Sequence, residues 1–270
     1  MGTYAAVSDI LLAAKIDSIR HGAEVDRWRT ESFHALEEHC LYWFNQGQGQ
    51  MNVAGSGFFC PANTVVFVPA GATHALSLWP NAIVKRVKIR DLPQIPMPNK
   101  PAKIELWDVR EQASYVVIFD GLARELENTS EGIGQAVLGY AHLFAAWLMR
   151  EVGRSAQMEE TAAAALVRRY CDLLEIRYTD GVTIAELAAE LGVTPTHLSR
   201  CCRRCCGMSA HEVLSSRLMY EARDLLAKTT VPINRISIDL GYSSPAYFTR
   251  AFQAVTGLTP SSFRKEAARA

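Results

Sequence analysis

The sequence predicts an α+β protein with an N-terminal antiparallel β unit and a C-terminal all-α domain. Residues 21–89 are short runs rich in β-branched and aromatic residues, separated by glycines, which is typical of strands and turns. From about residue 102 onward, apolar residues recur instead with helical spacing. A length of 270 residues allows about two domains, and 49% apolar with 21% charged residues is typical of globular proteins.

The β unit is expected to occupy residues 1–100. Short strands with frequent turns predict an antiparallel barrel or sandwich. Residues 1–20 are interpreted as a short helix or ordered arm, and the four prolines of residues 91–101 predict an extended exit from the unit. The clearest predicted strands are HCLYWF (39–44), GQMNV (49–53), TVVFV (64–68), HALSLW (74–79) and AIVKRVKI (82–89).

Two helices are predicted next, at about 102–128 and 133–152, within a linker region of residues 101–158. The second is rich in large apolar residues, including Leu143 and Trp147. One helix with so wide an apolar surface needs more than one partner. It either packs on the β unit or pairs two protomers.

The stretch Pro232–Arg264 has the pattern of a helix-turn-helix. Ile233, Ile236 and Leu240 give a short helix one apolar stripe, and Gly241 follows where a glycine would end it. Ser244 and Pro245 are suited to begin the next helix, because serine caps helix N-termini and proline fits the first turn. A helix-turn-helix is therefore predicted at about 232–257, with its second helix suited to the DNA major groove.

The same pattern occurs 50 residues earlier, at about 183–207. Its residues Pro195, Leu198, Arg200 and Gly207 lie 50 positions before their counterparts. A helical pattern at 210–228 joins the two copies, and the spacing indicates an internal duplication. We expect residues 159–270 to form one domain. The counterparts are Pro245, Phe248, Arg250 and Gly257.

The segment LGYSSPAYFTRAFQAVTGLTPSSFR (240–264) closely resembles the signature of the AraC/XylS family of bacterial transcription regulators. This resemblance implies two helix-turn-helix modules on a connecting helix and a cupin-like N-terminal barrel that binds a small-molecule effector. The implied function is a sequence-specific regulator of transcription, expected to be an activator that binds double-stranded DNA and works with RNA polymerase. A homodimer paired through helix 133–152 is expected, with no enzyme activity and no cofactor.

Charge is distributed as DNA binding requires. The chain has no net charge, yet residues 191–270 carry 11 Lys and Arg against 5 Asp and Glu. The basic end is therefore the end with the helix-turn-helix modules, which suits phosphate binding. The residues expected on the DNA-facing sides of the two recognition helices are Pro195, Thr196, Ser199, Arg200, Arg203, Pro245, Ala246, Thr249 and Arg250.

The segment PAGATH, with Pro69, Gly71 and His74, resembles the second cupin motif. Arg86, Lys88 and Arg90 alternate along one predicted strand and so share a face. That face is either solvated or an anion site for a carboxylate or phosphate. The effector is expected at His39, His74, Arg86 and Arg90.

Two alternatives stay open. A metal-dependent cupin enzyme fused to a DNA-binding domain could use His34, Glu38, His39 and His74, although the H-x-H pair of such enzymes is absent and a metal-free unit is expected. The other alternative is a regulator that responds to thiol chemistry or metal through the segment CCRRCC. Its thiols are Cys201, Cys202, Cys205 and Cys206.

The sequence also predicts a cytoplasmic location. No uninterrupted apolar run reaches the length of a membrane span, and the N-terminus lacks the basic region of a signal peptide. The seven cysteines are therefore expected to be free thiols.

Overall fold

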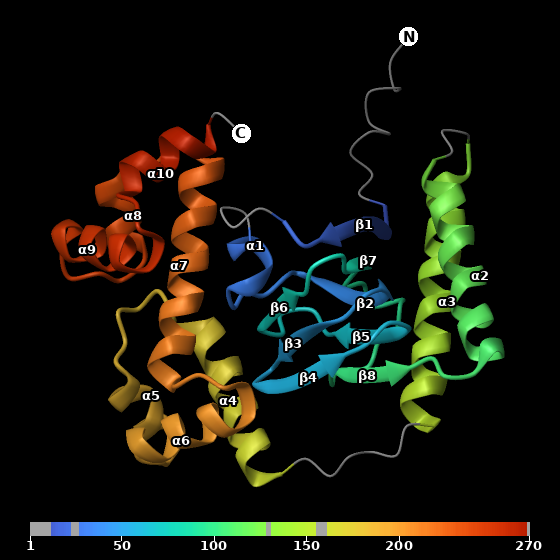
Figure 1. Ribbon diagram of the computed structural model, residues 1–270, viewed down its shortest axis with the longest axis horizontal. Helices are drawn as coiled ribbons and strands as arrows, with labels where there is room; N and C mark the ends of the chain where they lie inside the picture. The colour runs from blue at the N-terminus through green and yellow to red at the C-terminus, as the bar shows by residue number, and fades with distance from the viewer. Residues whose placement is uncertain (1–11, 23–26, 128–130, 155–160, 269–270) are drawn as a thin grey trace.

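A computed structural model describes residues 12–22, 27–127, 131–154 and 161–268. Two antiparallel sheets form the centre of the molecule, with helices α2 and α3 on one side and helices α4 to α10 on the other (Figure 1). The strands are β1 (Ala14–Arg20), β2 (Glu38–Gln46), β3 (Gly49–Val53), β4 (Ser56–Cys60), β5 (Thr64–Val68), β6 (His74–Leu78), β7 (Ile83–Arg90) and β8 (Ala102–Glu105), and a short helix α1 (Trp28–Glu31) follows β1.

The strands do not close into a barrel, so the barrel expected for residues 1–100 is wrong in this respect. One sheet has five strands in the order β1-β7-β2-β5-β8, and the other has three in the order β4-β3-β6. No ladder joins the two sheets within the described ranges; a single bridge pairs His34 with His74. The arrangement is the sandwich alternative, in which two packed sheets share a core.

The central strands β2 and β5 of the five-stranded sheet are buried on both faces. Alternate residues of its strands point to opposite sides. On one side Leu41, Trp43 and Phe67 pack under helices α2 (Val109–Leu126) and α3 (Ile133–Arg154). On the other side Tyr42 and Phe44 pack against the three-stranded sheet. Because β2 and β5 are buried on both faces, their sequences are nearly continuous apolar runs.

Two segments differ from the predictions. Residues 14–20 form an edge strand paired with β7 rather than a helix, and residues 1–11 lie outside the described ranges. Residues 102–105 form β8 on β5, so the helix predicted from about residue 102 begins only at Val109. Asp108 is its N-cap and accepts a hydrogen bond from the Arg110 nitrogen, which fixes the start of the helix.

The C-terminal helices form where the spacing predicts them. The first helix-turn-helix module is α5 and α6, the second is α8 and α9, and α7 connects them (Figure 1). The core of the first module contains Leu198 and Cys202, and that of the second contains Phe248 and Phe252. The helices are α4 (Ala162–Arg177), α5 (Ile184–Glu190), α6 (Pro195–Cys206), α7 (Ala210–Lys228), α8 (Ile233–Asp239), α9 (Pro245–Thr256) and α10 (Pro260–Ala267).

The turn of the second module touches the loop before the first. Gly241 has a positive φ of 73°, and a Cβ there would overlap the backbone nitrogen of Gly181. The equivalent turn glycine of the first module, Gly192, has nearly the same φ of 74°, but a Cβ there would meet nothing within 4 Å. The glycines at 181 and 241 thus allow backbone contact between the loop that precedes α5 and the turn of the second module.

Among the described residues no helix combines the length and the apolar character needed to cross a membrane.

Gly241→Ala should destabilise the protein more than Gly192→Ala. Both changes place alanine at a left-handed backbone position, which costs about 1 kcal/mol. Only Gly241→Ala also forces two backbone segments apart, so its loss should exceed that of Gly192→Ala by roughly 1–3 kcal/mol. Urea unfolding of the two variants measures the difference, and equal losses would mean that the contact between Gly181 and Gly241 does not contribute.

Candidate DNA-binding interface and interdomain pocket

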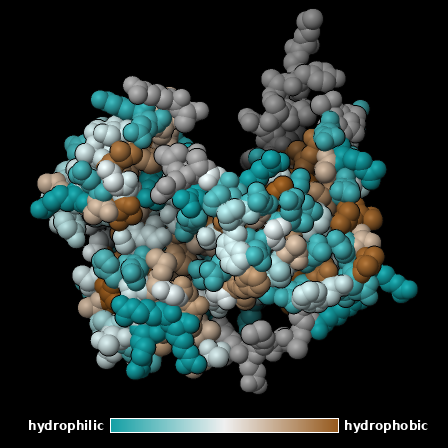
Figure 2. Space-filling model, viewed as in Figure 1, coloured by the Kyte–Doolittle hydropathy of each residue, from teal (hydrophilic) through white to brown (hydrophobic). Residues whose placement is uncertain are grey.

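The recognition helix of the first module, α6, is built by local signals. The Thr194 hydroxyl accepts a hydrogen bond from the His197 nitrogen at 3.2 Å, Pro195 occupies the first turn, and Gly207 ends the helix in the left-handed region. Leu198 and Cys202 are buried, so the opposite side of the helix faces solvent. The surface over α5 and α6 is mainly hydrophilic in Figure 2.

Helix α9 repeats this construction in the second module. Ser244 caps it through the Tyr247 nitrogen at 3.2 Å, Pro245 occupies the first turn, and Gly257 ends it. All nine residues expected to face DNA are exposed or partly exposed on α6 and α9. They are Pro195, Thr196, Ser199, Arg200, Arg203, Pro245, Ala246, Thr249 and Arg250.

Two further residues share these surfaces. His197 and Tyr247 stand 50 positions apart in the first turn of their helices, and both are at least partly exposed. His197 Nδ1 accepts a hydrogen bond from Arg200 Nη2 at 3.0 Å, which holds that guanidinium over the helix start. The 50-residue offset could have identified this pair, because it already aligned the residues on either side.

Three of the four cysteines of the CCRRCC segment lie on the buried side of α6, whereas Arg203 and Arg204 are exposed. Cys201, Cys202 and Cys206 are buried, and all seven cysteines of the chain are free thiols. Burial raises the pKa of Cys202 to about 12 and also raises the pKa of Cys205 and Cys206. Thiols of this kind stay protonated at neutral pH, whereas oxidant and metal sensing needs thiolates. The geometry therefore favours packing over sensing.

The β unit contacts α4, beside the first module, through a buried charge network that also includes α7. Arg217 of α7 donates to Glu175 at 3.0 Å and to Glu221 at 2.9 Å, and its guanidinium stacks on Tyr178. Glu175 also accepts a hydrogen bond from the Thr73 hydroxyl at 2.9 Å. One carboxylate thus links α4, α7 and the β unit.

A second contact reaches the core of the other module. Trp28 of α1 is only 7% exposed and packs edge-on against Tyr220 of α7 and Phe263 of α10. Arg223 of α7 lies over the Trp28 ring and donates to the Ser32 hydroxyl at 3.3 Å. No local pattern pointed to this role, because the partners of Trp28 are near the other end of the chain.

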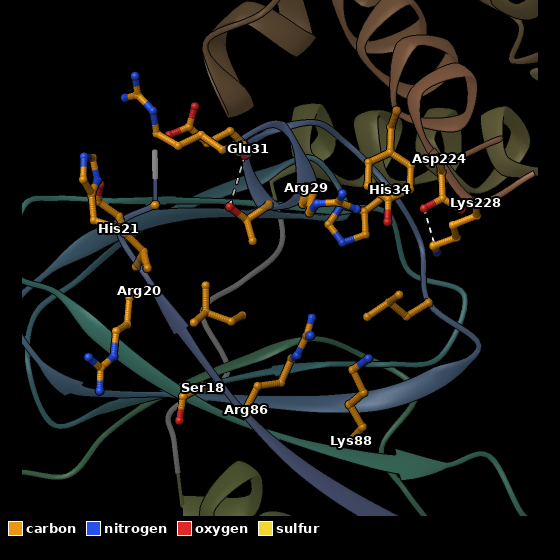
Figure 3. A pocket seen from close by; sticks show the side chains of 17 residues that line it. Ser18, Arg20, His21, Arg29, Glu31, His34, Arg86, Lys88, Asp224 and Lys228 are labelled. Atoms are coloured by element: carbon orange, nitrogen blue, oxygen red, sulfur yellow. Dashed lines mark hydrogen bonds and ion pairs between the residues drawn. The ribbon is translucent and has the colours of Figure 1, made fainter. Parts of the chain in front are cut away.

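Between these contacts lies a pocket of about 400 Å³, here called the interdomain pocket. It is bounded by β1, β7 and α1 on one side and by α7 on the other; Arg86 and Lys88 rise from β7 toward His34, Asp224 and Lys228 (Figure 3). The Lys and Arg side chains that line it are Arg20, Arg27, Arg29, Arg86, Lys88 and Lys228.

Of the four residues expected to bind the effector, Arg86 lines this pocket and the others lie elsewhere. His74 is fully buried, with Nε2 2.6 Å from the Tyr42 hydroxyl. His39 Nε2 lies 3.2 Å from Asp91, and Arg90 is on β7 beyond the pocket.

The four candidate metal ligands do not come together as one site. His34 and His74 have adjacent rings, with centroids 4.4 Å apart, but His39 bonds to Asp91. Throughout the described ranges no group of three or more His, Cys, Asp or Glu side chains could hold a metal ion.

Comparison with known proteins gives the same assignment as the motifs. Residues 187–266 match the helix-turn-helix domain family. The arabinose operon regulatory protein of Escherichia coli is 24% identical over 232 residues, covering 81% of this chain and 77% of that protein. A transcriptional regulator of Bacillus subtilis, YisR, is 28% identical over 92 residues, covering 34% and 32%.

Among solved structures, ToxT of Vibrio cholerae covers 93% of this chain and 97% of its own, with 14% identity and a TM-score of 0.46. The C-terminal domain of the response regulator AraT from Geobacillus stearothermophilus is 29% identical and covers 39% of this chain and 88% of its own, with a TM-score of 0.37.

The matched domain, the duplicated modules and the regulatory relatives agree with the signature at residues 240–264. The chain therefore carries an AraC-type helix-turn-helix domain and is a DNA-binding regulator of transcription.

Proposed function

We propose that this protein is a sequence-specific regulator, expected to be an activator, whose DNA binding is controlled by a small-molecule effector bound to its N-terminal unit. The observation that carries this proposal is the pair of capped recognition helices, each with an exposed arginine at the same position, Arg200 and Arg250. A connecting helix of 19 residues holds the modules apart, as recognition of successive major grooves about 34 Å apart requires. Such a protein acts in the cytoplasm, on DNA, together with RNA polymerase.

Arg200→Ala and Arg250→Ala should each weaken binding to the selected operator by roughly 1–3 kcal/mol, because an arginine can bond a guanine through two hydrogen bonds. The binding affinity is measured on two DNAs, an operator duplex selected from a random library and a scrambled duplex. Arg235→Ala is the control, since Arg235 is exposed on α8 and pairs with Asp239 away from the recognition helix. Equal weakening on operator and scrambled DNA would make that arginine a phosphate contact, and unchanged binding by both variants would contradict the proposed interface.

Effector control needs a physical link between the N-terminal unit and the modules. A ligand can shift a protein only through different affinities for two arrangements. The N-terminal unit supplies two links, the bond from Thr73 to Glu175 beside the first module and the insertion of Trp28 into the core of the second. The interdomain pocket lies between these links, and its volume of about 400 Å³ suits a small molecule, which supports effector control.

Trp28→Phe should selectively loosen the second module. The smaller ring removes part of the packing on Tyr220 and Phe263, so hydrogen exchange of the α8, α9 and α10 amides in the full chain should quicken while that of α5 and α6 stays unchanged. Trp107→Phe is the matched control, because Trp107 is 77% exposed. Unchanged exchange in α8 to α10 would show that Trp28 does not support the module.

We further propose a homodimer paired through α3. Trp147 does not belong to the pairing surface, because it is only 3% exposed and packs against Tyr115 with ring centroids 4.8 Å apart. We propose as the seam the exposed residues of α3 spaced alternately by four and three, which share one face of the helix. Hydrophobic residues gather along α2 and α3 in Figure 2. The seam residues are Gln135, Gly139, His142, Ala146, Met149 and Gly153.

Ala146→Arg should convert the dimer into a monomer, because a long charged side chain prevents close approach at a seam that alanine and glycine keep narrow. Ala189→Arg makes the same change on the exposed side of α5, outside the seam, and should leave the dimer intact. Sedimentation velocity gives the oligomeric state. A dimeric Ala146→Arg protein would exclude α3 as the interface.

A further inference from the structure

The interdomain pocket is positively charged around Arg86 and Lys88. Its six Lys and Arg side chains face two lining carboxylates, Glu31 and Asp224. A third carboxylate, Asp17, holds Arg86 through two bonds of 2.6 and 2.8 Å and lies 3.9 Å from Lys88. Lys228 pairs with Asp224 at 2.6 Å. Arg86 and Lys88 thus share the single carboxylate of Asp17, so this part of the pocket keeps a net positive charge and attracts an anion.

The same pocket also presents hydrogen-bond acceptors. His34 Nδ1 lies 2.9 Å from the Ser32 carbonyl, which can only accept, so Nδ1 carries the proton and Nε2 is left as an acceptor. Burial, with smaller effects from nearby cations that include Arg86, lowers the pKa of His34 to about 4, which keeps the ring neutral at pH 7. The ring stacks on Tyr220 of α7, with centroids 4.5 Å apart, which fixes its orientation.

Few lining residues are aliphatic. Ile19, Leu36 and Leu78 are the leucine and isoleucine residues that line the pocket. Six Lys and Arg side chains and two carboxylates line it with them. A long acyl chain would lie against these charged groups and remove water from them, which is costly. An anion that also carries hydroxyl groups would satisfy both the cations and the acceptors.

On the basis of the proposed effector control, we propose that the interdomain pocket binds a small polyhydroxylated anion, such as a sugar phosphate or a sugar acid, with its anionic group at Lys88 and Arg86 and a hydroxyl donating to His34. The ligand would touch β7 and α1 of the N-terminal unit and α7 of the C-terminal domain at once. Because Arg27 and Arg29 flank Trp28, an occupant also contacts the helix that enters the second module.

The test uses the full-length protein and titration calorimetry with five probes: ribose phosphate, gluconate, ribose, inorganic phosphate and oleate. Ribose phosphate or gluconate should bind at least about tenfold more tightly than ribose and inorganic phosphate, because only they offer both groups. If ribose phosphate alone binds, the anionic group is a phosphate; if gluconate alone binds, it is a carboxylate. Preferential binding of oleate, or of neither hydroxylated anion, would overturn the proposal.

Variants locate the site. Lys88→Gln should weaken binding about tenfold or more, whereas Lys85→Gln, on the same strand but outside the pocket, should have no effect. His34→Phe keeps a ring against Tyr220 but removes the acceptor, and should reduce the preference for hydroxylated over simple anions. Binding that persists in Lys88→Gln would overturn the assignment.

The binding measurement does not depend on DNA, so the two proposals can fail separately. A hydroxylated anion that binds at Lys88 without changing operator affinity would support the proposed site and contradict effector control. Operator binding that requires Arg200 and Arg250, without any anion binding, would contradict only the ligand assignment.

Discussion

The arrangement of the two halves depends on how one buried cation is paired. Arg217 has a side chain only 7% exposed, and a guanidinium removed from water is costly unless carboxylates and hydrogen bonds surround it. Glu175 and Glu221 supply these from α4 and α7, and Tyr178 covers the face of the group. Because Glu175 also receives the Thr73 hydroxyl, the geometry that satisfies Arg217 also sets where the β unit sits against the first module.

The two modules differ in how many contacts they make with the β unit. The first module and α4 rest on the β3–β4 hairpin, where Gly55 lies directly against Val167 of α4, and their shared core contains Ala75 of the β unit. The second module meets the β unit mainly through the single side chain of Trp28. A change at the N-terminal unit can therefore reach the second module through fewer contacts than the first, and so at lower cost.

Local features were predictable from the sequence, and long-range ones were not. Helix limits follow from residues a few positions apart, such as Thr194 with His197 and Ser244 with Tyr247, so spacing alone located both modules. Sheet closure depends on which distant edges pair, and no local pattern records that. For the same reason the sequence did not show that Trp147 is buried. It also did not show that, of the four residues expected to bind the effector, Arg86 lines the interdomain pocket and His39, His74 and Arg90 do not.

The position of Trp28 also bears on how the protein is made. Its partners Tyr220 and Phe263 belong to the last part of the chain to be synthesised, while the strands that carry α1 are complete much earlier. Until Phe263 leaves the ribosome, a large aromatic side chain on the finished β unit has no core to enter. Completion of the second module is therefore the step that removes this surface from water, and a chain that ends early would leave it open to association with other proteins.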